Sequence, residues 1–221
     1  MTRETFDRHL RELQDQVLVL GSMVEKAIDR SMEALKTRNL GLARQVVADD
    51  REINGKRFGI EEKCIELIIR EQPMASDLRI IMAVANIIVE LERIGDYAAG
   101  IANSAIMIGD ESPLKPLIDL PRMAAKTCEM LRRSLDAFVN RDADAARQIA
   151  KEDDEVDDLY HQVFRELLTF MAEDPRTITR ATRLIWVAHR LERSADRVTN
   201  ICERVVFIVS GRMEEIGTSK Y

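Results

Sequence analysis

The sequence contains one internal repeat, and the repeated segments carry acidic side chains. The segment ERIGD at 92–96 returns 100 residues later as ERSAD at 192–196. A second pair of segments, LARQV at 42–46 and AARQI at 145–149, is offset by 103 residues. Self-similarity at a nearly fixed spacing indicates that each copy folds as the same structural unit. We therefore predict two copies of one unit of about a hundred residues.

Helix-forming residues dominate the composition. The 221 residues include 9 glycines and 5 prolines, and only 5% are aromatic. Ala, Leu, Ile, Met, Glu and Arg are abundant, which favours helices over strands. With 46% hydrophobic residues, a chain of this length can bury a substantial core. The predicted fold class is all-α.

Apolar residues recur at alternating steps of three and four, which is the pattern of one helical face. Three such runs are present in each copy. Those of the first copy extend from Phe6 to about Lys36, from about Val46 to before Pro73, and from Ser76 or Asp77 to Gly109; those of the second copy begin near Met123, Ile149 and Leu184, and Gly211 ends the last. We expect two tandem antiparallel three-helix bundles, with residues 1–109 in the first, 110–121 as a linker and 122–221 in the second.

Charge, cysteine content and missing motifs exclude several classes of protein. The net charge is −6 without a basic tail, which argues against a nucleic-acid partner. Cys64, Cys128 and Cys202 are too widely spaced for a thiolate zinc site or a disulfide framework. There is no export signal and no apolar run long enough for direct membrane insertion, so we expect a cytoplasmic protein. Phosphate loops, dinucleotide fingerprints and catalytic triads are missing as well, so we expect no enzyme activity.

Acidic side chains are paired within each copy. Glu92 and Asp96 are four residues apart, as are Glu192 and Asp196, so each pair lies within about 40° on one helix face. No arginine follows either glutamate at the i+4 or i+8 position to neutralise the pair. A cation bound between the two carboxylates would offset their repulsion. Each pair is therefore a candidate metal site.

Further oxygen donors extend both pairs. Asp50 and Asp153 occupy positions where the apolar stripe of their helix predicts a hydrophobic residue. The predicted metal ligands are Asp50, Asn54, Glu92, Asp96 and Asn103 in the first copy and Asp153, Asp157, Glu192, Asp196, Asn200 and Glu203 in the second. Clusters of carboxylate and amide oxygens suit iron, manganese, magnesium or calcium, whereas the shortage of nearby His and Cys argues against four-coordinate zinc.

Two other interpretations of these residues remain open. Acidic pairs four residues apart are common on solvated helix faces, and Glu92 and Asp96 point largely away from the apolar stripe of Leu91 and Ile94. The Asp158-x-x-His161 segment resembles half of a di-iron carboxylate motif, although such bundles use two Glu-x-x-His segments. A solvated acidic face and a di-iron bundle are therefore the alternatives to a metal site made of oxygen donors.

The duplicated motifs and the chain length together resemble one known family. PMASDLR at 73–79, followed by ERIGD at 92–96 and ERSAD at 192–196, is similar to the PhoU family of phosphate-specific transport system accessory proteins. The resemblance extends from Phe6 to about Gly211. It implies a cytoplasmic, often dimeric negative regulator that links the ATPase of the phosphate ABC transporter to a sensor histidine kinase. Such a regulator represses phosphate-starvation genes and restrains phosphate uptake when phosphate is abundant.

The resemblance also implies bound metal. Family members hold multinuclear clusters of iron or zinc through E/D-x-x-x-D motifs, which here match Glu92 with Asp96, Glu192 with Asp196, and Asp153 with Asp157. Asn54 departs from this motif, so the first copy is expected to hold its metal less tightly than the second. The functional alternatives are a carboxylate-bridged metal-storage or di-iron protein, and an accessory of a low-affinity phosphate permease.

Overall fold

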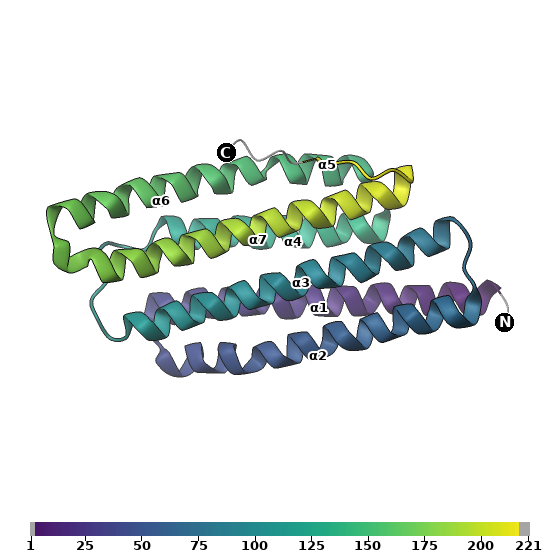
Figure 1. Cartoon of the computed structure of the whole chain (residues 1–221), viewed down its shortest axis with the longest axis horizontal. Coiled ribbons are helices and arrows are strands. Elements are labelled where there is room, and N and C mark those ends of the chain that lie inside the picture. The colour runs from purple at the N-terminus through teal and green to yellow at the C-terminus, as the bar shows by residue number, and fades with distance from the viewer. Residues whose placement is uncertain (1–2, 217–221) are drawn as a thin grey trace.

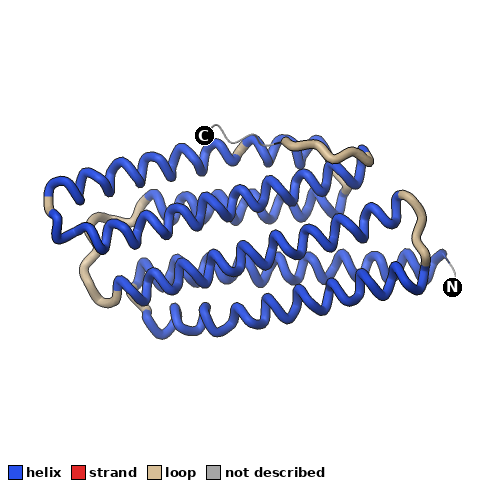
Figure 2. Tube along the Cα trace, viewed as in Figure 1, coloured by secondary structure: helices blue, strands red, loops and turns tan. Residues whose placement is uncertain are grey.

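The computed structural model describes residues 3–216, and this part of the chain is helical without any strand (Figure 2). The first three helices are α1 (Arg3–Thr37), α2 (Leu40–Glu71) and α3 (Ser76–Ile108). The others are α4 (Asp119–Asn140), α5 (Ala143–Lys151), α6 (Asp153–Glu173) and α7 (Ile178–Ser210), with a 3₁₀ turn, η1 (Pro175–Thr177), before the last. The predicted all-α fold is confirmed.

The helices form two bundles that lie side by side (Figure 1). One bundle consists of α1, α2 and α3, and the other of α4, α5, α6 and α7. α3 and α7 run antiparallel along the centre of the molecule and contact each other extensively, and α1 also contacts α4. α2 and the α5–α6 pair lie on the two outer sides. Each outer helix therefore packs on one of the two central helices, α3 or α7.

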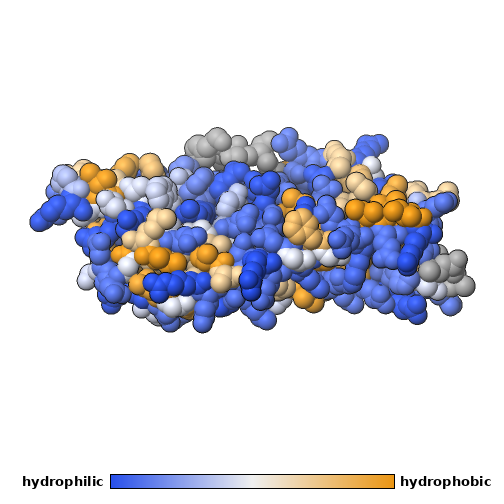
Figure 3. Space-filling model, turned by 60° about the horizontal axis from the view of Figure 1, so that its bottom comes forward, coloured by the Kyte–Doolittle hydropathy of each residue, from blue (hydrophilic) through white to orange (hydrophobic). Residues whose placement is uncertain are grey.

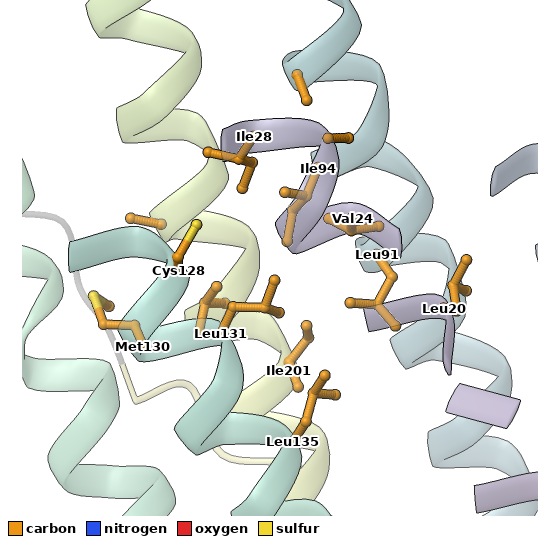
Figure 4. Close-up of a cluster of buried hydrophobic side chains, with 14 of the residues drawn as sticks. Leu20, Val24, Ile28, Leu91, Ile94, Cys128, Met130, Leu131, Leu135 and Ile201 are labelled. Atoms are coloured by element: carbon orange, nitrogen blue, oxygen red, sulfur yellow. The ribbon is translucent and has the colours of Figure 1, made fainter. Parts of the chain in front are cut away.

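A single hydrophobic core connects the two bundles. Figure 4 shows side chains of this core from four helices: Leu20, Val24 and Ile28 from α1, Leu91 and Ile94 from α3, Leu131 and Leu135 from α4, and Ile201 from α7. Apolar residues at steps of three and four lie on one face of each helix, so these faces can meet in the middle. Ile94 is completely buried, and its truncation to alanine would cost about 2–5 kcal/mol.

The structure differs from the predicted elements at two places. α4 begins at Asp119, inside the expected linker at 110–121. Pro121 therefore lies in the first helical turn, where its missing N–H is not needed. The predicted fifth helix is divided into α5 and α6 at Glu152, whose N–H donates to the Ile149 carbonyl three residues back, at 3.0 Å. This tightened turn places Asp153 at the start of a helix.

Apolar side chains are present on the surface in separate patches (Figure 3). Exposed apolar residues occur at the corner between α2 and α3, where Ile69 and Met74 are 70% and 79% exposed. No described helix has a stretch long and apolar enough to cross a membrane. All three cysteines are buried and free.

Candidate metal centre

Residues of α2 and α3 form the first acidic cluster. Asp50 and Asn54 project from α2 toward Glu92 and Asp96 of α3. The Asn54 amide donates to Asp50 Oδ2 at 3.1 Å, whereas Asp50 Oδ1 is buried without a hydrogen-bond partner. Gly95 lets α2 pack closely on α3 beside this cluster, since a β-carbon there would lie 3.1 Å from Ile53 Cγ2. The first cluster therefore consists of three carboxylates and one amide, contributed by α2 and α3.

The carboxylates of the first cluster destabilise one another's charged forms. Burial and the neighbouring Asp96 carboxylate raise the pKa of Asp50. Burial and Asp96 also raise the pKa of Glu92, although Arg57, from the same helix as Asp50, partly opposes this shift. Repulsion between like charges raises a carboxyl pKa, so each of these acids makes its neighbours harder to ionise.

Residues of α6 and α7 form the second acidic cluster, in the same arrangement. Asp153 and Asp157 come from α6, and Glu192 and Asp196 from α7. Burial, followed by repulsion from the other three acids, raises the pKa of Asp153 to about 7. Burial and the neighbouring aspartates raise the pKa of Glu192 to about 7 as well. Asp153 Oδ1 and Glu192 Oε2 are buried without a hydrogen-bond partner.

Two basic side chains lie beside the second cluster, although burial lowers the pKa of His189 and so disfavours its charged form. Arg193 Nη1 lies 2.6 Å from Asp196 Oδ2, and His189 Nδ1 lies 3.2 Å from Glu192 Oε2 without hydrogen-bond geometry. The expectation that no arginine neutralises the acidic pairs is therefore wrong for Asp196. The i+4 and i+8 positions run forward from the glutamate, whereas Arg193 lies directly after it and reaches the aspartate three residues further along the helix.

Three of the predicted ligands lie outside both clusters. Asn103 is exposed and lies two helical turns beyond the first acidic pair. Asn200 donates to Glu90 Oε2 at 3.2 Å, on the neighbouring α3. Glu203 Oε1 accepts a hydrogen bond from the Ile216 N–H at 3.2 Å and so holds the segment after α7. These side chains share the predicted helix face, but each has a different environment.

Several residues around the second cluster were not identified from the sequence. Lys126 and Arg133 of α4 each donate to Glu152 Oε2 at 2.8 Å. Burial would raise the pKa of Glu152, but these hydrogen bonds outweigh it and lower the pKa. The acid directly before Asp153 is thus neutralised, while Asp153 is not. The contact of His189 could have been found, because it lies three residues before a cluster acid.

The donor set fits a hard cation. Asp50, Asp153 and Glu192 each have a buried oxygen without a donor, and a buried charge without a partner is costly. A metal ion would satisfy these oxygens and offset the repulsion between the carboxylates. Within residues 3–216, however, no three His, Cys, Asp or Glu side chains are already gathered around one point. Metal binding in either cluster would therefore require side-chain rotation.

Comparisons with known proteins agree with the duplicated architecture. The profile of the PhoU domain matches residues 17–105 and 120–205. The chain is 37% identical over 217 residues to the phosphate-specific transport system accessory protein PhoU homolog of Clostridium acetobutylicum, covering 98% of this chain and 99% of that one. A crystal structure of PhoU from Pseudomonas aeruginosa has a TM-score of 0.88 and 38% identity, covering 94% of this chain and 100% of that one.

A second crystal structure gives the same result. The phosphate transport system regulatory protein PhoU from Streptococcus pneumoniae has a TM-score of 0.89 and 30% identity, covering 95% of this chain and 99% of that one. Sequence and structure therefore agree over nearly the whole length, including both copies of the repeat. The chain belongs to the PhoU family.

Proposed function

We propose that this protein is a cytoplasmic, non-enzymatic regulator that serves as an accessory of phosphate-specific transport. The observation that carries the proposal is similarity to PhoU relatives over nearly the whole chain, with both copies present. In this role it binds the ATPase of the phosphate ABC transporter and a sensor histidine kinase, most simply as a homodimer. It restrains uptake and represses the phosphate-starvation response when phosphate is abundant.

The acidic clusters would serve this role as metal sites. Asp153, Asp157, Glu192 and Asp196 are the donors of the second site, and the first cluster supplies the equivalent set with Asn54 in place of one acid. Iron, zinc, manganese and magnesium are the candidate ions. Each cluster joins an outer helix to a central one, so bound metal would stabilise that packing and with it the surface offered to partners.

Deleting the gene tests the regulatory role. In cells grown with abundant phosphate, the deletion should raise alkaline phosphatase activity and phosphate uptake, and the intact gene on a plasmid should restore both. Unchanged phosphatase and uptake would contradict the proposal. If uptake changes only through a low-affinity permease, measured in cells without the ABC transporter, the protein is an accessory of that permease.

A metal-storage or oxidase function makes a different prediction. Purified protein loaded with ferrous iron would then consume oxygen or peroxide with repeated turnover. The proposed regulator binds metal without such turnover, so an oxygen electrode distinguishes the two functions. Sedimentation of the same preparation would show whether the protein is a dimer.

A further inference from the structure

The central helices form a groove that the acidic clusters do not account for. The groove has a volume of about 360 Å³ and is lined by Tyr97 from α3 and by Trp186, His189, Arg190 and Arg193 from α7. Trp186 is 46% exposed and is the single tryptophan of the chain. Tryptophan, tyrosine and arginine are the residues most enriched at energetically important positions of protein interfaces.

Arg190 is the basic side chain of this groove that has no acidic neighbour in the described part of the chain. Arg193 and His189 lie against Asp196 and Glu192, as described above. Arg190 Nη1 donates to the Ser104 hydroxyl at 3.1 Å, and its guanidinium occupies the space where a β-carbon of Gly100 would stand. No acidic side chain among residues 3–216 forms an ion pair with Arg190. A guanidinium has five N–H donors, and the hydrogen-bond partner of Arg190 among residues 3–216 is the Ser104 hydroxyl, so Arg190 keeps donors for an outside acceptor.

The internal repeat provides a comparison for this groove. The residues aligned with Arg190 and Tyr97 are Glu90 and Arg197, and they form an ion pair of 3.3 Å between α3 and α7. Asn200 donates to the same glutamate. Where Glu90 faces Arg197, the charges of the α3–α7 contact are therefore balanced within the protein. At the equivalent position of the second copy, Arg190 stands in place of Glu90, and no acid of the described residues balances its charge.

We propose that the α3–α7 groove is the docking site for an acidic segment of a protein partner. A carboxylate of that segment pairs with Arg190, and an adjacent apolar or aromatic side chain packs on Trp186. The attraction between the acidic segment and Arg190 is local to the groove, because the whole chain carries a net charge of −6. A nucleotide polyphosphate fits less well, because Arg193 already pairs with Asp196 and leaves Arg190 to face several closely spaced charges alone.

This inference rests on the proposed accessory role, which names the transporter ATPase as a partner. The test measures binding of the purified full-length chain to the purified ATPase subunit of the cognate phosphate transporter by calorimetry. Trp186→Ser and Arg190→Glu should each weaken binding by about tenfold or more. Phe58→Ser and Arg51→Glu, which change an exposed aromatic and an exposed arginine on α2, should bind as the unaltered chain does.

The possible results distinguish a wrong docking site from a wrong accessory role. Equal binding by all variants would overturn the groove as the docking site and leave the accessory role intact. If the unaltered chain fails to bind the ATPase, both the partner and the docking site are wrong. Because Arg190 contacts α3, a folding defect is checked by circular dichroism, and Trp186→Ser tests the site independently on an exposed side chain.

Two other occupants are tested with the chain alone through the fluorescence of Trp186. Addition of ADP should leave the emission unchanged, and so should a hundredfold rise in protein concentration. An ADP-dependent shift that Arg190→Glu abolishes would identify a nucleotide site and overturn the proposal. A concentration-dependent shift would identify a second copy of the chain as the occupant, with the same consequence.

Discussion

The two acidic clusters share one plan but differ in how well their charges are balanced. In the first, an amide, Asn54, hydrogen bonds to Asp50, and Arg57 opposes the rise in the Glu92 pKa. In the second, the aligned positions are Asp157 and Tyr160. The second cluster therefore has one more carboxylate and no counterpart of Arg57, although Arg193 pairs with its Asp196, and burial and repulsion raise the pKa of Asp153 to about 7.

This difference shows how duplication can produce two unequal sites. Both copies retain the acids on the central helices, α3 and α7, whereas the changes are on the outer helices. In the metal-free protein the first cluster destabilises the fold less than the second does, because fewer charges repel one another there. A bound cation gains more at the second cluster, where the excess of negative charge is larger. We therefore expect the second copy to hold metal more tightly and to be less stable without it.

The largest expected effect is stabilisation of the metal-free protein by neutralising the second cluster. Asp153→Asn combined with Glu192→Gln should raise the free energy of unfolding at pH 8 by about 1–3 kcal/mol, after allowance for solvent screening. Asp50→Asn with Glu92→Gln should raise it by less than about 1 kcal/mol. Urea unfolding with a chelator present measures both. Glu173→Gln, which changes an exposed acid at the other end of α6, is the control. Equal effects of the two double variants would contradict the difference between clusters.

The same charges predict how stability depends on pH. Because the pKa of Asp153 and of Glu192 is raised to about 7, the folded state binds protons that the unfolded state has already released. Stability of the metal-free protein should therefore fall as the pH rises from about 4 to about 7 and level off above. Thermal unfolding across this range would show the fall, and the Asp153→Asn, Glu192→Gln variant should remove most of it. An unchanged profile in that variant would exclude these two groups as its cause.

Exchanging Arg57 and Tyr160, which occupy aligned positions of the two copies, should change the metal affinity of both clusters. Arg57→Tyr removes the cation beside Glu92, so affinity of the first cluster for Mn²⁺ should rise by about threefold to tenfold. Tyr160→Arg should lower the affinity of the second cluster by a similar factor. Titration calorimetry of each variant measures the change. If both substitutions leave affinity unaltered, Arg57 and Tyr160 do not determine the difference between clusters.

The smallest effect is expected from Asn54→Asp, which makes the first cluster resemble the second. The hydrogen bond to Asp50 is lost and a negative charge is added, so the metal-free protein should be destabilised by about 0.5–1 kcal/mol. Mn²⁺ affinity of the first cluster should rise at the same time. Asn54→Ala loses the same hydrogen bond without adding charge and separates the two contributions. A gain in stability for Asn54→Asp would show that the acids of this cluster do not repel.

The helices and the faces on which the acids lie could be predicted from the sequence, because helical periodicity determines angular position. Contacts across helices could not be predicted in this way. Arg57 and Glu92 belong to different helices, and periodicity carries no information about their relative height. Asn200 and Glu203 lie on the predicted face, yet neighbouring α3 and the segment after α7 contact them instead. The break at Glu152 was also missed, because no glycine or proline marks it.

Two unequal metal sites are tested most directly by the metal content of protein purified without a metal-affinity tag. Elemental analysis should find iron, zinc or manganese in the unaltered chain. The Asp153→Asn, Glu192→Gln variant should lose most of it, and the Asp50→Asn, Glu92→Gln variant a smaller share. Metal content that is unaffected by either double variant, or reduced equally by both, would contradict two unequal metal sites built from the repeated acids.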